Sequence, residues 1–339
     1  SQKTAHILLV SLTVMKNKYL SISLLWAILL PVFMGCNNPE SPSQWAIALH
    51  GGAGYMVPEN YTDAQLEQYK SEMQAALNKG IAILENGGTS LDAVEQVVRY
   101  LEDCPLFNAG KGAVFTHDGR NELDAAIMEG IELRAGAVAG VGDIKNPIST
   151  ARLVMEKSPH VLMVGKGASL FAQQNGAEMV DSSYFYTEGS WKELQRILES
   201  EKKMGTVGCV AVDKHGNLAA ATSTGGMSNK RYGRVGDVPI IGAGTYANNK
   251  TCAVSATGHG EFFIRYTVAH DISALMEYKG LSLSNAADIV VLDKLVKAKG
   301  DGGIIAVDTK GNVHLAFNTP SMLRAYAKAN GERGVEIFK

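Results

Sequence analysis

Apolar residues recur along the chain at two spacings, one typical of buried strands and one typical of amphipathic helices. Residues 45–49 form an apolar run that leads into the glycine-rich segment 50–54, which predicts a buried strand and then a tight loop. Residues 62–65 fit a helix capping box and are followed by apolar residues at helical spacing. A second helix is predicted over residues 89–100, with Thr89 or Ser90 as its cap.

Strands and turns are expected after these two helices. A His-Asp-Gly turn separates the apolar residues 113–115 from the segment 123–128, which predicts a hairpin. Helical spacing returns at residues 149–156 and 168–174, on either side of a strand-like run at residues 161–164. We therefore expect strands and helices to alternate through this part of the chain.

The second half contains a short internal echo. The pattern Ala-Val-Asp, two residues and Gly-Asn occurs at residues 211–217 and again at 306–312, each time between apolar runs, which predicts two strand-turn-strand units. Helical periodicity fills residues 261–278 and 281–297 between them, while residues 175–204 are polar and predict an exposed, partly helical connector. Strand pairs that alternate with helix pairs indicate layered sheets flanked by helices.

The beginning of the sequence resembles a secretion signal. Met15 and two nearby lysines precede an apolar run over residues 20–34, which ends at Gly35 and Cys36. We expect residues 1–36 to direct export, with lipid attached to Cys36, so that the protein is a membrane-anchored lipoprotein or a periplasmic protein of a Gram-negative bacterium. The alternatives are an ordinary signal peptide cut nearby or a membrane anchor.

Composition narrows the function classes. The chain is 46% hydrophobic and 19% charged with a net charge of -2, which is typical of a folded protein and excludes a nucleic-acid partner. Four cysteines are present, and loss of Cys36 leaves an odd number, so no disulfide framework is expected. No Cys-x-x-Cys pair or histidine cluster indicates zinc.

Thr206 has an unusual place in the sequence, because it begins a predicted strand directly after the polar connector. A threonine hydroxyl is a weak nucleophile and needs an adjacent base. The α-amino group of a chain terminus, with a pKa of about 7.7 to 8.0, is such a base. A cut between Gly205 and Thr206 would therefore give one residue both groups. Taken alone, Thr206 and Thr224 are ordinary strand threonines, and Arg234 with Asp237 forms a surface ion pair.

Five ordered motifs change that interpretation, because together they resemble the plant-type asparaginase or isoaspartyl peptidase family of N-terminal nucleophile hydrolases. The resemblance covers about residues 44–325. It implies an α+β fold, a four-layer αββα sandwich, cut into an α fragment (residues 37–205) and a β fragment (residues 206–339). The motifs are Gly205-Thr206-Val207-Gly208, Thr222-Ser223-Thr224-Gly225-Gly226-Met227, Gly233-Arg234-Val235-Gly236-Asp237, Gly242-Ala243-Gly244-Thr245-Tyr246-Ala247 and Thr257-Gly258-His259-Gly260-Glu261.

The resemblance also implies a role for each matching residue. Thr206 would be the nucleophile, with Thr224 as a hydroxyl that hydrogen-bonds its surroundings. Thr257 and Gly258 would form the oxyanion hole, through a hydroxyl and a backbone N–H. Arg234 would bind the substrate α-carboxylate and Asp237 its α-ammonium, a pair that we call the charge clamp. The substrate pocket would be completed by Val235, Gly236, His259 and Gly260, and His50 is expected to be structural.

The segment 101–111 matches a family loop that wraps a sodium ion with backbone carbonyls, and carbonyl oxygen suits such a hard cation. Asn108 would lie near the catalytic centre and help to place the nucleophile. No cofactor is expected for catalysis itself. The carbonyl donors would be Leu101, Glu102, Cys104, Phe107, Ala109 and Lys111.

The function implied is hydrolysis of β-aspartyl dipeptides and L-asparagine by a self-cleaving enzyme, with a dimer of cleaved αβ heterodimers as the assembly. Glycosylasparaginase, which acts on GlcNAc-asparagine, is the nearest alternative, but its branch has Asp where this chain has Gly205. An uncleaved lipoprotein that binds ligands is the alternative outside enzymes. A denaturing gel separates these possibilities, because only the active enzyme runs as two fragments.

Overall fold

Strand pairing sets the framework of this protein in a computed structural model that describes residues 44–199 and 205–339. An eight-stranded sheet has the order β12-β11-β1-β5-β6-β2-β3-β4, and a four-stranded sheet has the order β10-β9-β8-β7. Neighbouring strands pair antiparallel, except that β3 and β4 are parallel. The larger sheet comprises β1 (Ala46–Gly54), β2 (Leu123–Glu129), β3 (Ala135–Val141), β4 (Leu162–Val164), β5 (Val207–Val212), β6 (Leu218–Thr224), β11 (Ser321–Lys328) and β12 (Arg333–Phe338). The smaller comprises β7 (Thr245–Ala247), β8 (Cys252–Gly258), β9 (Gly302–Asp308) and β10 (Val313–Phe317).

The central strands are apolar on both faces because both faces are covered. Successive side chains of a strand point to opposite sides. In β5, Val207 and Cys209 belong to one hydrophobic cluster, whereas Val210 belongs to another. The second cluster also contains Ile305 and Val307 from β9, so it joins the two sheets. Burial on both faces explains why these strands are nearly continuous apolar runs.

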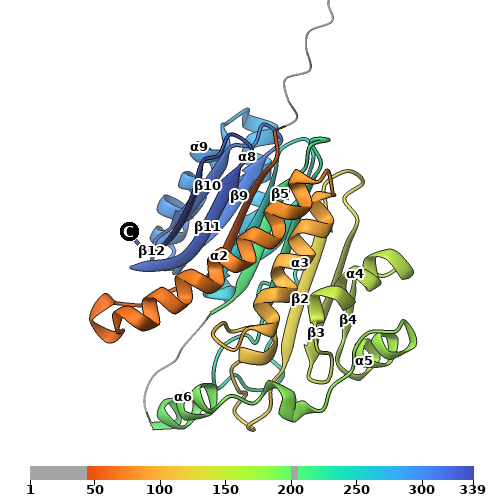
Figure 1. Cartoon of the computed structure of the whole chain (residues 1–339), viewed down its shortest axis with the longest axis vertical. Coiled ribbons are helices and arrows are strands. Elements are labelled where there is room, and N and C mark those ends of the chain that lie inside the picture. Colours follow the sequence, from red (N-terminus) through yellow and green to blue (C-terminus); the bar gives the residue numbers. More distant parts are fainter. Residues whose placement is uncertain (1–43, 200–204) are drawn as a thin grey trace, which may run out of the picture. The chain divides into compact units, whose positions relative to one another are not determined.

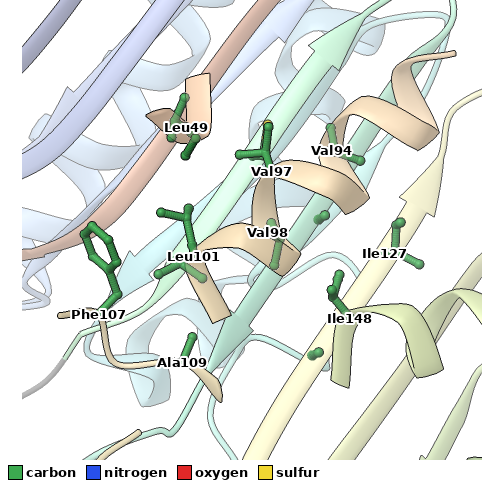
Figure 2. Packing of buried hydrophobic residues seen from close by; sticks show 14 of the residues in the cluster. Leu49, Val94, Val97, Val98, Leu101, Phe107, Ala109, Ile127 and Ile148 are labelled. Atoms are coloured by element: carbon green, nitrogen blue, oxygen red, sulfur yellow. The ribbon is translucent and has the colours of Figure 1, made fainter. Parts of the chain in front are cut away.

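Helices α2 (Asp63–Glu85) and α3 (Ser90–Asp103) cover one face of the larger sheet, and Figure 1 shows them side by side across its strands. The capping box of α2 is formed, because Thr62 accepts from the Gln65 backbone N–H and the Gln65 side chain accepts in return. Figure 2 shows the apolar stripe of α3, which packs over β5 and β6, the strands that lie between β1 and β2 in the sheet. The stripe and its neighbours include Val94, Val97, Val98, Leu101, Leu49 and Ile127.

The remaining helices lie where the sequence predicts them, with two differences in detail. The predicted helix 261–278 is divided at Thr267, whose φ of 46° is left-handed and ends one helix where the next begins. The predicted helix 281–297 is continuous but has π geometry in its middle. These helices are α4 (Pro147–Lys157), α5 (Gly165–Gln174), α6 (Glu188–Glu199), α7 (Gly260–Tyr266), α8 (Val268–Lys279), α9 (Leu283–Asp288), the π-helix η5 (Ile289–Lys294) and α10 (Leu295–Lys297), with 3-10 turns η2 (Pro58–Asn60), η3 (Gly110–Gly112) and η4 (Ser182–Phe185).

The two strand-turn-strand predictions are confirmed. In each turn an aspartate carboxylate accepts backbone N–H groups from the residues that follow it, Asp213 in the first unit and Asp308 in the second. The connector is partly helical, as expected, through η4 and α6. The α+β class is also correct, because helices pack on largely antiparallel sheets.

The hairpin predicted between residues 113–115 and 123–128 is wrong. Residues 113–115 form no strand, and β2 instead pairs with β3 on one side and β6 on the other. The apolar side chains that suggested a strand are buried in a loop, where the Asn121 side-chain amide donates to the carbonyls of Ala113 and Val114. Burial and periodicity alone do not distinguish a buried loop from a strand.

Gly136 provides a test of how closely β3 packs against α4. A Cβ added at this position would lie 2.0 Å from the Ala151 carbonyl oxygen, which is backbone and has little freedom to move. We expect Gly136→Ala to lower the free energy of unfolding by about 1–3 kcal/mol, the usual effect of overpacking. The matched control is Gly167→Ala on an open face of α5, which should stabilise the helix by about 0.5–1 kcal/mol. Equal effects in urea denaturation would contradict this packing.

Candidate active site

The junction between the connector and β5 brings together three of the predicted catalytic residues. The Thr206 hydroxyl donates to the Thr224 hydroxyl oxygen at 3.2 Å, and Thr224 donates in turn to the Gly205 carbonyl oxygen at 2.9 Å. The backbone N–H of Gly226 donates to Thr224 as well, at 2.9 Å. Thr206 is only 7% exposed, so in the uncut chain these groups are shielded from water. The hydroxyl of Thr224 thus links the hydroxyl of Thr206 to the peptide bond before it.

Asn108 supplies a second donor to the same carbonyl. Its side-chain amide donates to the Gly205 oxygen at 2.7 Å and to the Gly226 oxygen at 2.7 Å. Phe107 and Ala109, on either side of it, are buried in the core beneath α3 (Figure 2) and fix the loop. The Asn108 side-chain oxygen accepts from the Val114 backbone N–H, which fixes the amide orientation. Two converging donors therefore polarise the Gly205 carbonyl.

A bulge in β1 connects Thr206 with Thr257. The register of β1 against β11 shifts between His50 and Gly52, and Gly52 has a left-handed φ of 112°. A Cβ on Gly52 would lie 3.4 Å from the Thr206 nitrogen, so the bulge passes directly by the nucleophile. The next residue, Ala53, donates its N–H to the Thr257 hydroxyl oxygen at 3.1 Å. Among residues 44–199 and 205–339, no acceptor is found for the Thr257 hydroxyl proton, which remains able to bind an oxyanion.

The charge-clamp residues converge on Gly260. A Cβ at Gly260 would lie 2.8 Å from Asp237 Oδ1 and 2.9 Å from Arg234 Nη2, so the missing side chain leaves room for both groups. Asp237 is buried, and burial raises the pKa of its carboxyl to about 7. Within the described part of the chain, its Oδ2 has no hydrogen-bond donor. A buried carboxyl oxygen without a donor can bind a cation such as a substrate ammonium.

Glu261 is a site residue to which the sequence analysis assigned no role. Its carboxylate forms a two-bond pair with Arg234, from Nε to Oε1 at 2.9 Å and from Nη2 to Oε2 at 2.9 Å. These bonds to Arg234 lower the pKa of the Glu261 carboxyl. His259 Nε2 lies 3.2 Å from the same carboxylate. The only signal for Glu261 in the sequence was its place at the end of the Thr257 motif, because its partner Arg234 lies 27 residues away.

The other predicted pocket residues lie beside these groups. Val235 and Gly236 connect Arg234 to Asp237, and a Cβ on Gly236 would lie 3.0 Å from Arg234 Nη1. Gly258 is the last residue of β8 and pairs with Gly302 of β9. The structure therefore brings the predicted catalytic and substrate-binding residues into one continuous region, from Asn108 through Thr206 and Thr257 to Asp237.

Carbonyl oxygens of Glu102 and Phe107 lie against the glycines of the loop after α3. A Cβ on Gly112 would lie 2.1 Å from the Phe107 carbonyl oxygen, and one on Gly110 would lie 2.3 Å from that of Glu102. Carbonyl oxygen is a ligand that suits a hard cation. Across the described ranges, no cluster of three or more His, Cys, Asp or Glu side chains is placed to hold a metal ion, so any ion here depends on main-chain oxygens.

His50, which was expected to be structural, contacts the predicted nucleophile Thr206 directly. Its Nδ1 lies 3.2 Å from the Thr206 carbonyl oxygen, and its Nε2 lies 3.0 Å from the Ser255 hydroxyl. The ring is completely buried, and burial lowers the pKa of His50 to about 3. His50 is therefore a neutral hydrogen-bonding group next to Thr206.

Comparison with known proteins shows which family the chain resembles. The family model described as Asparaginase matches residues 43–337. An isoaspartyl peptidase of Salmonella typhimurium is 50% identical, with 86% of this chain and 98% of that protein aligned. A probable isoaspartyl peptidase/L-asparaginase of Arabidopsis thaliana is 44% identical, with 87% of this chain and 99% of that protein aligned. An isoaspartyl peptidase/L-asparaginase of Bos taurus is 42% identical over 83% of this chain and 92% of that protein.

The location predicted from the sequence, an exported lipoprotein or a periplasmic protein, is wrong. The comparisons contradict it, because the relatives from bacteria, plants and animals are mostly cytosolic enzymes. In the part of the chain that the structure describes, no helix is long and apolar enough to cross a membrane. Cys36, the predicted lipid attachment site, lies outside the described residues.

His50 generates a prediction for stability against pH. The unfolded chain binds a proton at His50 below pH 6.5, whereas the folded chain does so only near pH 3, so acidification favours unfolding. The free energy of unfolding should fall by about 1.4 kcal/mol from this group between about pH 7.5 and about pH 5.5. Urea denaturation of wild type and His50→Asn at both pH values is the measurement. The free energy of unfolding should fall less in the variant, by the amount that His50 contributes. An unchanged pH dependence in the variant would mean that His50 is protonated in the folded state.

Proposed function

The chain belongs to the asparaginase family, and from that premise we propose that it is an isoaspartyl peptidase and L-asparaginase that activates itself by a cut before Thr206. The observation that carries the proposal is the arrangement around the Gly205 carbonyl. Its oxygen accepts from Asn108 and Thr224, while the Thr206 hydroxyl donates to Thr224. A polarised carbonyl next to a hydroxyl with a proton acceptor is an arrangement suited to acyl transfer.

The self-cleavage step follows from these contacts. Thr206 Oγ attacks the Gly205 carbonyl carbon while Thr224 accepts its proton and passes its own proton to the Gly205 oxygen, to which Asn108 also donates. The C–N bond breaks, the Thr206 nitrogen takes the proton, and an ester joins Gly205 to Thr206. Water then hydrolyses the ester, releasing the Gly205 carboxylate and the free Thr206 hydroxyl and amino group. The α fragment would comprise residues 37–205 and the β fragment residues 206–339.

After the cut, the same hydroxyl attacks the side-chain carbonyl of the substrate. The Thr206 amino group acts as base, with an ordinary pKa of about 7.7 to 8.0. The Thr257 hydroxyl stabilises the oxyanion together with the Gly258 N–H, and the Ala53 N–H bond to Thr257 Oγ1 supports this role by directing the proton away from β1. The tetrahedral intermediate then expels ammonia or the amino group of the leaving residue, which takes the proton from the Thr206 ammonium, and water hydrolyses the resulting acyl-enzyme.

The charge clamp selects the substrate. Asp237 binds the α-ammonium through its unpaired oxygen, and Arg234 binds the α-carboxylate. Since Glu261 already holds Nε and Nη2 of Arg234, the substrate carboxylate is bound through Nη1, or displaces Glu261 from the guanidinium. His259 and Gly260 line this end of the pocket.

We infer the finer architecture from the hydrophobic clusters. One cluster joins helices α2 and α3 to the larger sheet, a second joins the two sheets, and a third joins the smaller sheet to helices α7, α8 and α9. This sequence of contacts supports the αββα sandwich of N-terminal nucleophile hydrolases.

Two further features remain proposals. A sodium ion is held by the carbonyls of the loop 101–111, for which the match of this segment to the family loop and the suitability of carbonyl oxygen for a hard cation are the support. The cleaved protein forms a dimer of αβ heterodimers. The exposed apolar side chains at edge strand β4 and the adjoining α5, among them Val164 and Leu170, are consistent with an interface. Glycosylasparaginase activity is less well supported, because Gly205 stands where that branch has Asp.

The proposed cleavage is tested by denaturing electrophoresis and N-terminal sequencing. The wild type should give two fragments, the second beginning at Thr206, and Thr206→Ala should remain whole. Asn108→Ala should cleave about 100-fold more slowly, because one of the two oxyanion donors is lost. Thr150→Ala is the control: its hydroxyl is buried in α4 and has no hydrogen-bond partner among the described residues, so cleavage should be normal. A fragment that begins elsewhere would remove Thr206 from the mechanism.

The charge clamp predicts a preference between isomeric dipeptides. β-Aspartyl-leucine keeps both α groups free, whereas α-aspartyl-leucine has its α-carboxylate in the peptide bond and leaves Arg234 opposite a neutral carbonyl. We expect hydrolysis of the β isomer and of asparagine only. Asp237→Asn should lower kcat/KM for the β isomer by about 10- to 100-fold, the loss of one charged hydrogen bond. Arg134→Ala, at an exposed arginine remote in sequence, is the control. Equal kcat/KM for the two isomers would rule out the clamp.

A further inference from the structure

A completely buried run of polar side chains lies behind Thr206 and has no part in the reaction described above. It begins at the Thr206 carbonyl oxygen, which is bonded to His50, and His50 contacts Ser255. Ser255 Oγ lies 2.7 Å from Thr222 Oγ1, and the Thr245 hydroxyl donates to Thr222 at 2.8 Å. The four side chains come from β1, β8, β6 and β7, so the run connects the two sheets.

The direction of each hydrogen bond in this run follows from its two ends. A backbone carbonyl only accepts, so Nδ1 of His50 must carry the proton. The buried ring is neutral and has a single N–H, which leaves Nε2 as an acceptor. Ser255 must therefore donate to Nε2 and accept from Thr222, and Thr222 accepts from Thr245. The Thr206 carbonyl thus specifies the tautomer of His50, and the hydroxyl of Ser255 complements it by donating to Nε2.

Gly208 provides an independent observation on the same space. It pairs with His50 across β1 and with Thr222 across β6. A Cβ at Gly208 would lie 2.0 Å from Ser255 Oγ and 2.5 Å from His50 Nε2. The absence of a side chain two residues after Thr206 thus makes the room in which imidazole and hydroxyl meet.

We propose that His50, held in its Nδ1–H tautomer by the Thr206 carbonyl and the Ser255 hydroxyl, is a positioning residue that fixes the main chain of Thr206 and so aims its amino group and hydroxyl. The inference rests on the proposed function, in which Thr206 becomes a chain end. The Thr206 carbonyl is not part of the bond that is cut, so His50 can hold it before and after cleavage. A chain end has no preceding residue to orient it, and small errors in the placement of a nucleophile cost large factors in rate.

The first test is spectroscopic and does not depend on activity. In protein labelled with 15N-histidine, long-range 1H–15N correlation distinguishes a protonated ring nitrogen from a bare one. The His50 signal, assigned by its absence in His50→Asn, should show Nδ1 protonated and Nε2 bare. A spectrum with the proton on Nε2 would overturn the proposal.

The second test compares two substitutions with β-aspartyl-leucine as substrate. In His50→Asn the side-chain amide can occupy the place of Nδ1 and still donate to Thr206, whereas in His50→Gln it reaches toward Ser255 instead. We expect kcat to stay within about 3-fold of wild type for Asn and to fall at least about 10-fold for Gln, with KM little changed because the charge clamp is intact.

The outcomes separate this inference from the proposed function. Equal losses of kcat in both variants, or a loss expressed in KM, would show that His50 has only a structural role. If either variant does not fold, the tautomer in the wild-type protein decides, with assignment by the shift of the Nε2 signal in Ser255→Ala. A wild type that cleaves but does not hydrolyse β-aspartyl-leucine would refute the proposed function, while the tautomer measurement would still test the inference.

Discussion

The structure depends on one constraint: Thr206 lies directly before β5, a strand that is buried on both faces. Strand β5 lies in the middle of the larger sheet, with α3 on one side and the smaller sheet on the other. Every polar group near its start must find a partner in the protein, because water does not reach it and an unpaired buried group is costly. The hydroxyls of Thr224 and Ser255 and the imidazole of His50 meet that requirement. The reactive arrangement is thus also the one that satisfies buried hydrogen bonds.

The charged residues of the clamp are not satisfied in the same way as the buried hydroxyls. Arg234 has a full partner, but among the described residues Asp237 does not. Arg234 is neutralised by Glu261 through two bonds, whereas Asp237 has an oxygen with no donor in the described structure, and its pKa is raised to about 7. A substrate with an ammonium and a carboxylate on one carbon complements this imbalance. In the proposed function, the specificity for such a substrate and the cost of an empty site therefore both arise from Asp237.

Local signals in the sequence predicted local structure well. The capping box at Thr62, the Thr89 cap and the two aspartate turns depend on residues within five positions of one another. Strands β11 and β12, and the pairing of β1 with β11, join distant segments and gave no such signal. The apolar residues 113–115 were misassigned because a buried loop and a buried strand have the same composition.

The candidate site divides in the same way. Thr206, Thr224 and Asn108 were identified because ordered motifs resemble a family, and the structure places them around one carbonyl. The contacts of His50 with Ser255, 205 residues apart, depend on the packing of two sheets and on the space left by Gly208, neither of which is readable from one sequence. Their roles remain proposals.

The strand order of the larger sheet has a consequence for the two pieces that a cut at Gly205 would create. Strand β1 of the first piece lies between β11 and β5 of the second, and β6 of the second pairs with β2 of the first. The pieces are interleaved, so that separating them would break three backbone ladders at once. Scission would therefore leave a single cooperative body held without any covalent link, and loss of either piece would be an unfolding event and not a dissociation.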